Sequence, residues 1–184
     1  MNNSEYCAYT YRHRKAIEYL VNKLFEDGEI KEEMLKRVKL HDVDKMIMYQ
    51  FMSRAEASKY HKKTSRHHMA NNIPKTYCDK LEAVLDYESA GYTKPDKPLN
   101  AFDMINQFKA NGVVRSDICD DLLLICKGLG IARSYSVAED EVGMKYLSQF
   151  AEITEDMIAQ DVANYFSVVG SNAALVARKE DDIV

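Results

Sequence analysis

Residues that interrupt regular structure are scarce in this chain. Its 184 residues include 7 glycines and 3 prolines, which are the residues that most often end helices and strands. Apolar residues form no unbroken run longer than the five of Leu122–Cys126, whereas a helix that crosses a bilayer needs about 20. The shortage of glycine and proline favours an all-α protein, and the short apolar runs argue against a membrane span.

Cysteine is also sparse, and its spacing excludes two classes of small protein. The four cysteines, at positions 7, 78, 119 and 126, form no CxxC pair. A structural zinc knot and a disulfide scaffold are therefore not expected. The first residues contain no apolar segment of the kind that a secretory signal needs. We expect reduced thiols in a cytoplasmic protein.

Positive charge is in slight deficit along the chain. The 25 basic and 29 acidic side chains give a net charge of −4, which argues against bulk binding of nucleic acid. One segment, residues 61–68 (HKKTSRHH), is nevertheless densely basic. It fits either a solvated loop or a cationic lip that draws an anionic substrate toward a site. Lys94 and Lys97, in a following loop, are candidates to join such a lip.

Apolar residues recur at helical spacing along most of the chain. Asn100, Ser136 (with Glu139 three residues later) and Thr154 are expected N-caps of further helices. We expect one helical domain over residues 1–184, with the chemistry in residues 1–98 and additional helices in residues 99–184. The patterns in the first part predict helices over residues 6–25, 31–52 and 75–90, a break within 58–72 and a loop at 91–98.

Histidine and aspartate gather in the first part of the chain. All five histidines fall within the first 68 residues, and mixed His/Asp sites bind Zn, Mn, Fe, Ni or Mg. His13 and His41 interrupt the apolar stripes of their predicted helices. On one helix, the adjacent His41 and Asp42 would point about 100° apart, so they would share a metal only over their common edge. Asp86 lies between Ala83 and Ala90, which leave room for close approach.

His13 and two further residues near this cluster, Lys45 and Glu82, each have more than one interpretation. His13 on an apolar face could be a hydrogen-bonded core histidine. Lys45, one helical turn after His41, could either pair with Asp42 or Asp86 or bind a phosphate oxygen. Glu82, one turn before Asp86, could orient a ligand histidine or lie at the surface.

At these positions the chain resembles the HD-domain superfamily of metal-dependent phosphohydrolases. Its pattern is H…HD…D on separate helices of an all-α fold, and several branches place a lysine four residues after the HD histidine. Here the segment reads HDVDK at 41–45, and the His-His pair at 67–68 resembles the additional histidines of the two-metal branches. The run from HDVDK to LEAVLDYESAGYTKPDKP is similar to a small bacterial and phage HD-like family. The resemblance covers residues 9–100.

The resemblance implies one or two divalent metal ions. The first would be held by His13, His41, Asp42 and Asp86. Asp42 would bridge to a second ion held by histidines among His61, His67 and His68. The metal, which could be Mn, Mg, Fe, Ni or Zn, would lower the pKa of a bound water, and the resulting hydroxide would attack phosphorus.

The resemblance also implies the remaining roles and a substrate. Asp42 and Lys45 would be catalytic, and Lys45 would neutralise charge on the transferring group. The substrate would be a nucleotide or another small phosphorylated metabolite. Asp44 is not expected to replace the acidic residue that nucleotidase branches place three residues after the HD aspartate. The GYP signature of the cyclic-dinucleotide branch is absent. Substrate binding would involve Lys45, His61, Arg66, Lys94 and Lys97.

Two other functions stay open at this stage. The chain could be a non-catalytic helical module that binds a nucleotide or a protein, as a phage or bacterial accessory protein does. Its apolar runs at residues 122–126 and 166–169 could then form a homodimer or partner surface. The second alternative is oxygen-dependent chemistry at a di-iron site, which some HD-fold proteins carry out.

Overall fold

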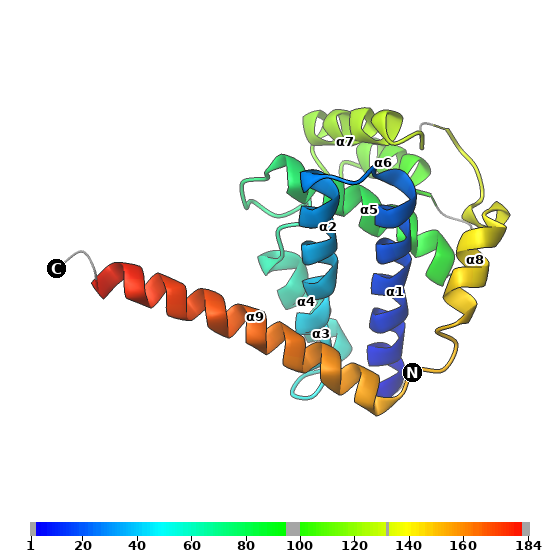
Figure 1. Cartoon of the computed structure of the whole chain (residues 1–184). Coiled ribbons are helices and arrows are strands. Elements are labelled where there is room, and N and C mark those ends of the chain that lie inside the picture. Colours follow the sequence, from blue (N-terminus) through cyan, green and yellow to red (C-terminus); the bar gives the residue numbers. More distant parts are fainter. Residues whose placement is uncertain (1–2, 95–99, 132, 182–184) are drawn as a thin grey trace.

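Every regular element that the structure describes is a helix (Figure 1). The computed structural model describes residues 3–94, 100–131 and 133–181, with side chains through residue 170. The prediction of an all-α protein is confirmed. No helix in these ranges is both long and apolar enough to cross a membrane. The elements are α1 (Asn3–Leu24), α2 (Glu29–Leu40), α3 (Val43–Met48), α4 (Arg54–Thr64), α5 (Tyr77–Thr93), α6 (Ala101–Ala110), α7 (Ser116–Gly128), the 3-10 turn η1 (Val137–Glu139), α8 (Glu141–Ser148) and α9 (Glu155–Asp181).

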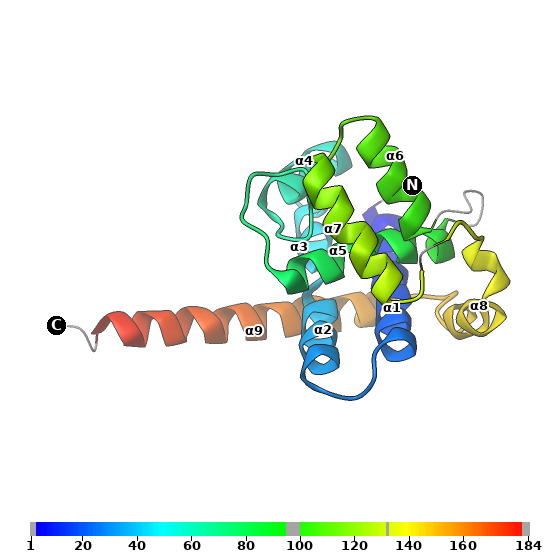
Figure 2. The ribbon, with the colours of Figure 1, turned by 90° about the horizontal axis from the view of Figure 1, so that it is seen from above.

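Helix α5 is the central element of the fold. It packs against α1 on one side and against α6 and α7 on another (Figure 2). Leu81 and Leu85 are almost completely buried, and each such side chain stabilises the fold by about 1.5–3 kcal/mol. The same apolar cluster includes Ile17 of α1, Leu122 of α7 and Leu147 of α8. The two predicted parts of the chain therefore share one core.

The helix predicted over residues 31–52 is two helices in the structure. The chain leaves α2 at His41, and Asp42 adopts a left-handed conformation with φ 60° before α3 begins. Aspartate tolerates this region better than most residues because its short polar side chain can bond locally. The expectation that His41 and Asp42 project from one helix is wrong. The break itself directs the two side chains.

The break predicted within residues 58–72 is also partly wrong, because α4 extends through Thr64. The start of α4 is fixed by a capping box in which the Ser53 hydroxyl accepts from the Glu56 backbone N–H and the Glu56 carboxylate accepts from the Ser53 backbone N–H. This arrangement satisfies donors that have no partner inside the helix. Residues 65–76 then form an irregular connection to α5.

The remaining boundaries follow the predicted caps with three differences. Asn100 and Thr154 cap α6 and α9, as expected. Ser136 caps the short turn η1, and Asp140 caps α8 instead. Helix α5 continues through Thr93, and residues 95–98 of the predicted loop lie outside the described part of the chain. Helix α9 begins against the body and extends beyond it (Figure 1).

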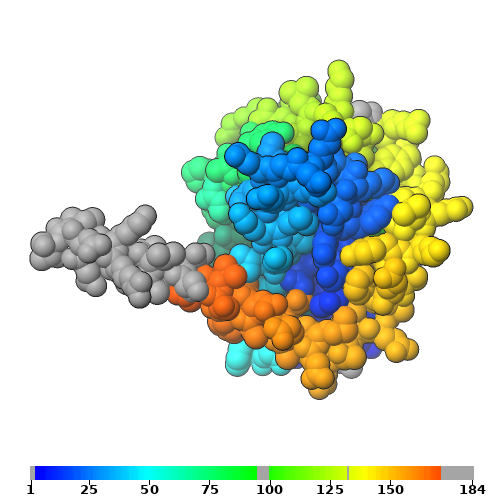
Figure 3. Space-filling model, viewed as in Figure 1, coloured from blue at the N-terminus to red at the C-terminus, as the bar shows by residue number. Residues whose placement is uncertain are grey.

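Helix α9 is attached at its start by a buried ion pair. The guanidinium of Arg14 on α1 pairs with the Asp161 carboxylate and also donates to the Lys39 carbonyl. Val162 and Tyr165 pack in a second, smaller apolar cluster. In the space-filling view, the first turns of α9 lie directly against α1 and α2 (Figure 3). The start of α9 is therefore part of the folded body.

The two apolar runs considered as partner surfaces differ in exposure. Most of the run at 122–126 belongs to the core, because Leu122, Ile125 and Cys126 are buried while Leu124 is exposed. On α9, Phe166 is 57% exposed. The first run thus contributes mainly to folding.

The packing of α8 yields a test of the fold. A Cβ at Gly143 would lie 2.7 Å from ring atoms of both Tyr19 and Tyr92. We expect Gly143→Ala to lower the free energy of unfolding by about 1–3 kcal/mol, because overpacking forces these rings to move. Gly128→Ala is the control, since nothing lies within 4 Å of a Cβ there. Urea denaturation should show Gly128→Ala neutral or stabilising by up to ~1 kcal/mol. Equal effects would contradict the packing of α8.

Candidate metal centre

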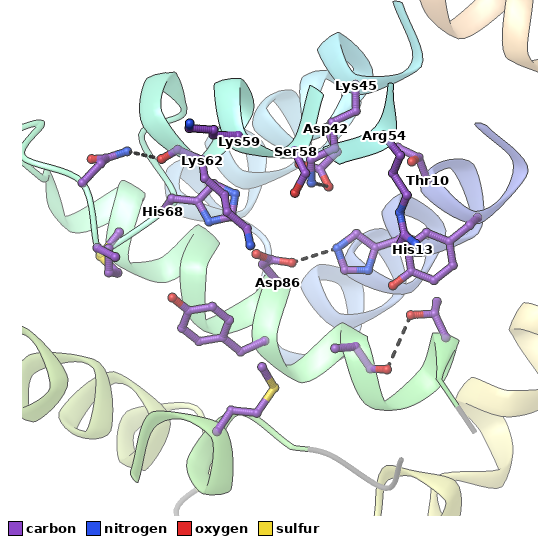
Figure 4. A pocket seen from close by; sticks show the side chains of 18 of the residues that line it. Thr10, His13, Asp42, Lys45, Arg54, Ser58, Lys59, Lys62, His68 and Asp86 are labelled. Atoms are coloured by element: carbon purple, nitrogen blue, oxygen red, sulfur yellow. Dashed lines mark hydrogen bonds and ion pairs between the residues drawn. The ribbon is translucent and has the colours of Figure 1, made fainter. Parts of the chain in front are cut away.

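Five short segments bring the histidines and acidic residues of the first part together. His13 comes from α1, His41 and Asp42 from the break between α2 and α3, and His61 from α4. Glu82 and Asp86 come from α5, one helical turn apart. His67 and His68 come from the connection between α4 and α5. Figure 4 shows His13, Asp42, His68 and Asp86 around one cavity.

Four of the histidine rings are held by their Nδ1 atoms. Nδ1 of His41 lies 2.8 Å from a carboxylate oxygen of Glu82. The sequence had left Glu82 open between such a role and a place at the surface. Nδ1 of His61 lies 2.7 Å from Asp44, a residue considered above only as a replacement for the acidic residue of the nucleotidase branches. An oxygen partner at Nδ1 fixes the ring and leaves Nε2 available as a ligand.

The other two rings follow the same pattern with hydroxyl partners. Nδ1 of His13 lies 3.1 Å from Ser89 Oγ, and Nδ1 of His67 lies 2.9 Å from Ser65 Oγ. The Ser89 hydroxyl donates to the Asp86 carbonyl, so it can accept from the His13 ring. With the proton on Nδ1, each neutral ring presents a lone pair at Nε2.

The Nε2 atoms converge on two carboxylate oxygens. Oδ1 of Asp42 lies 2.8 Å from Nε2 of His61 and 3.5 Å from Nε2 of His67. Oδ1 of Asp86 lies 2.8 Å from Nε2 of His13 and 3.8 Å from Nε2 of His41. The Nε2 atoms of His61 and His67 are 3.3 Å apart. Lone pairs that face one another at these distances require a proton or a metal ion between them.

Three buried atoms of this cluster have no hydrogen-bond partner within the described part of the chain. They are Nε2 of His41, Oδ1 of Asp42 and Nε2 of His68, the His61 ring nitrogen near Oδ1 of Asp42 being an ion-pair contact without the geometry of a hydrogen bond. An unsatisfied polar atom in a protein interior costs about 1–3 kcal/mol. The three atoms are of the types that bind divalent metals, so the residues present fit such an ion.

Donor atoms that lie within 4.8 Å of one another define four overlapping groups of three residues, which combine into two sets that share Asp42 and are also connected by a group of His41, His67 and Asp86. One contains His13, His41 and Asp42, and Asp86 joins it through His41. The other contains His61, His67 and His68, with Asp42 and Asp44 next to His61. Asp42 lies between the groups, since it contacts histidines of both. This arrangement offers ligands for two ions that share one carboxylate.

The acidic residues of the cluster stay ionised despite their burial. Burial alone would raise the pKa of Asp42, but His41 and Lys45 hold it well below its ordinary value. Burial likewise opposes ionisation of Asp86, and the contact with His13 lowers its pKa. For Glu82, the contacts with His41 and His67 outweigh burial and lower the pKa. The site is therefore rich in negative charge at neutral pH.

The pKa values of His41, His67 and His68 are shifted in opposite directions. Burial lowers the pKa of His41, and burial with the neighbouring His67 lowers the pKa of His68 to about 3. Burial also opposes the charged form of His67, but Asp42 and Glu82 raise its pKa to about 10. In the absence of a metal, His67 holds a proton at neutral pH. That proton occupies a place where a cation would interact with Asp42.

The cluster opens into a large cavity. The cavity has a volume of about 920 Å³, close to the upper end of the 300–1,000 Å³ typical of ligand sites. His13, Asp42, His68 and Asp86 line it, so part of each ligand group is accessible. Lys45 also lines the cavity, with Nζ 2.5 Å from Oδ2 of Asp42. A ligand in the cavity would meet Lys45 beside the candidate metal ligands.

The other predicted substrate-binding residues occupy separate positions. His61 is buried against Asp42 and Asp44, among the candidate metal ligands, so it is not part of an exposed cationic lip. Lys94 lines the cavity, 6.0 Å from the ring centroid of Tyr9. Lys97 lies outside the described residues.

Arg66 does not line the cavity. Its guanidinium binds the buried Asp79 carboxylate through two nitrogens and also donates to the Pro74 carbonyl. This pairing ties the α4–α5 connection to the start of α5. In the structure Arg66 thus has a structural contact, and its part in substrate binding stays a prediction.

Several cavity residues were not singled out from the sequence. Arg54, Ser58 and Lys59 of α4 line the cavity together with Lys62 and Lys63 of the basic segment. Their common face became visible only once α4 was known to be helical. The signal was present, because Ser53 and Glu56 have the spacing of a capping box.

Comparisons of the chain with protein-family models, with curated proteins and with solved structures find no match. The geometry of the site therefore carries the functional argument.

Glu82 provides a test of the second layer of contacts around the site. We expect Glu82→Gln to weaken binding of Mn²⁺ by about 10–100-fold, because loss of a carboxylate behind ligand histidines lowers their basicity. Glu33→Gln is the matched control, since Glu33 contacts the same Arg37 but no histidine. Titration calorimetry measures both affinities. A similar change in the two variants would contradict the orienting role of Glu82.

The protonation of His67 yields a second test. A metal that binds Nε2 of His67 must displace the proton that the raised pKa keeps there, so affinity should rise with pH. We expect the Mn²⁺ dissociation constant to fall by about tenfold per pH unit between pH 6 and 8 for each proton released. Calorimetry in buffers with different ionisation enthalpies counts the protons. An affinity that is independent of pH would contradict this assignment.

Proposed function

We propose that this chain is a metal-dependent phosphohydrolase of the HD type that acts on a small phosphorylated substrate. The observation that carries the proposal is the convergence of four Nε2 atoms on the carboxylates of Asp42 and Asp86, with each Nδ1 held by an oxygen. Three unsatisfied buried atoms in the same cluster support a bound cation. The order of the ligands along the chain also matches the resemblance described above.

The residues that would hold the ions follow from the two groups of donors. His13, His41, Asp42 and Asp86 would hold one divalent ion. His61, His67 and His68 would hold a second, with Asp42 shared. Bound ions of this kind polarise a phosphoryl oxygen and lower the pKa of a water molecule. Mn, Mg, Fe, Ni and Zn are all compatible with this mixture of nitrogen and oxygen donors.

The protein's own side chains would bind and orient the phosphoryl group. Lys45 lies beside Asp42 and lines the cavity, so its ammonium can donate to a phosphoryl oxygen and balance the charge that develops there. Burial opposes the charged form of Lys45, but the contact with Asp42 outweighs it and raises the pKa of Lys45. The same contact lowers the pKa of Asp42, so both groups stay charged. The reaction consumes one water. Its oxygen forms a new bond to phosphorus, the bond to the leaving oxygen breaks, and that oxygen receives a proton.

The cavity favours a small substrate over a polymer. Its volume of about 920 Å³ suits a metabolite with one to a few phosphates, and the net charge of −4 does not favour nucleic acid. A cytoplasmic location fits the four free thiols.

Asp42 provides the test of this proposal. Asn tolerates the left-handed backbone that Asp42 adopts, so Asp42→Asn removes the charge without adding backbone strain. We expect wild-type protein purified without chelator or a histidine tag to contain one or two metal ions, and Asp42→Asn to lose both the metal and phosphate release. Elemental analysis and a phosphatase screen over phosphorylated metabolites with Mn²⁺ provide the measurements.

Asp120→Asn is the control for this experiment, because Asp120 is an exposed carboxylate on α7 that pairs with Lys109. It should retain both metal and activity. Wild-type protein that binds none of Mn²⁺, Fe²⁺, Ni²⁺ or Zn²⁺ would overturn the proposal and leave a helical binding module. Metal binding with oxygen consumption and no phosphate release would favour di-iron chemistry instead.

A further inference from the structure

One face of α4 presents a row of cations to the cavity. Arg54, Ser58 and Lys62 are four residues apart, so they lie along one side of the helix. Lys59 and Lys63 form a second line beside the first, about 100° further around the helix, and all five residues line the cavity. From Arg54 to Lys62 the row extends about 12 Å, at 1.5 Å per residue. Figure 4 shows Arg54, Ser58, Lys59 and Lys62 around the cavity with Asp86 and His13. Such a row is longer than one phosphate group requires.

The lysines of this row form no ion pair with any acidic side chain that the structure describes. Within the described part of the chain, the ammonium groups of Lys59, Lys62 and Lys63 have no acidic partner, although Lys80 and Lys109 each pair with an aspartate. Like charges one turn apart on a helix repel each other. In a chain with more acidic than basic residues, this face of α4 keeps an excess of positive charge beside the cavity.

The opposite wall of the cavity is apolar. Met104 and Phe108 of α6 line it together with Val113 and Val114 and with Tyr87 of α5. Val113 is 51% exposed, and the ring of Phe108 packs edge-on against Tyr87 at 5.3 Å. Four of these five side chains have no strong hydrogen-bonding group. This wall suits a hydrocarbon better than a nucleobase, which is recognised through hydrogen bonds to its edges.

The tyrosines at the α1 end of the cavity already have partners. The guanidinium of Arg54 lies 4.6 Å from the ring centroid of Tyr6. Tyr9 is stacked with His13 at 6.0 Å and has Lys94 at the same distance. These rings are therefore less available for stacking on a base.

The two walls together define a ligand, and the inference rests on the proposed function. We propose that the cavity binds a diphosphate ester of an apolar alcohol. One phosphate would lie near Asp42 and Asp86, the second would contact the α4 cations, and the hydrocarbon would lie against Met104 and Val113. The site would thus select for a second phosphate and for an apolar substituent at the same time.

Binding to protein loaded with Mn²⁺ tests this inference, because without a metal ion the carboxylates of Asp42 and Asp86 would repel the first phosphate. All measurements use the Lys45→Gln background, in which turnover is suppressed. The probes are inorganic phosphate, pyrophosphate, ADP and geranyl diphosphate, measured by titration calorimetry. We expect pyrophosphate to bind roughly tenfold more tightly than phosphate, because it reaches more of the charged row. Geranyl diphosphate should bind roughly tenfold more tightly than pyrophosphate or ADP, because it also buries hydrocarbon.

Two variants separate the contributions of the walls. Lys59→Gln/Lys62→Gln should weaken binding of both diphosphates by about tenfold and leave that of phosphate nearly unchanged. Lys36→Gln/Lys127→Gln removes the same charge from exposed positions on α2 and α7 and is the matched control. Met104→Gln/Val113→Ser should remove the preference for geranyl diphosphate and leave pyrophosphate binding intact.

Each contrary result overturns the inference. Equal affinities for phosphate and pyrophosphate would exclude the second phosphate position, as would equal effects of the two lysine pairs. ADP binding as tight as that of geranyl diphosphate would exclude the apolar alcohol. Because every arm compares affinities and none measures phosphate release, these failures are distinct from loss of metal or of phosphatase activity in the unmodified protein, which would contradict the proposed function.

Discussion

The structure depends on one buried cluster in which histidine rings and carboxylates from separate segments face one another. Nε2 atoms of four histidines face the carboxylates of Asp42 and Asp86, and burial leaves little water to separate them. A cation placed among them removes the repulsion, and a proton on His67 does so in part. α1, the α2–α3 break, α4 and α5 each contribute to this one cluster. The packing of these helices is therefore also the assembly of the site.

The left-handed residue between α2 and α3 shows how local conformation and chemistry are joined. Had the helix continued, the side chains of His41 and Asp42 would have pointed about 100° apart around its axis. The φ of 60° at Asp42 ends the helix and places its carboxylate next to histidines from α4 and the following connection. A residue in this backbone region costs free energy unless its surroundings compensate. The contacts with Lys45 and His61 provide that compensation.

The sequence was sufficient for the fold class and for bringing the histidines, Asp42 and Asp86 into one hypothesis, but it was insufficient for their geometry and for the residues of α4 that line the cavity. Polar residues on apolar stripes identified His13 and His41, since a buried polar ring needs a partner. Helical periodicity, however, does not report a single left-handed residue, so the α2–α3 break was missed. The charge density of residues 61–68 obscured the end of α4, although a capping box marked its start. The pairing of Arg66 with Asp79 was not foreseen, because the irregular α4–α5 connection that brings the two together has no periodic pattern.

Helix α4 has a further consequence through its two faces. His61 and Ala57 lie one turn apart on the face buried in the molecule, while Lys62 and Ser58, each the next residue, border the cavity. In the proposed function a metal ion would bind at the first face and an anion at the second, so both would contact the same short helix. By thermodynamic linkage, any effect of the metal on the affinity for the anion would be matched by an equal effect of the anion on the affinity for the metal.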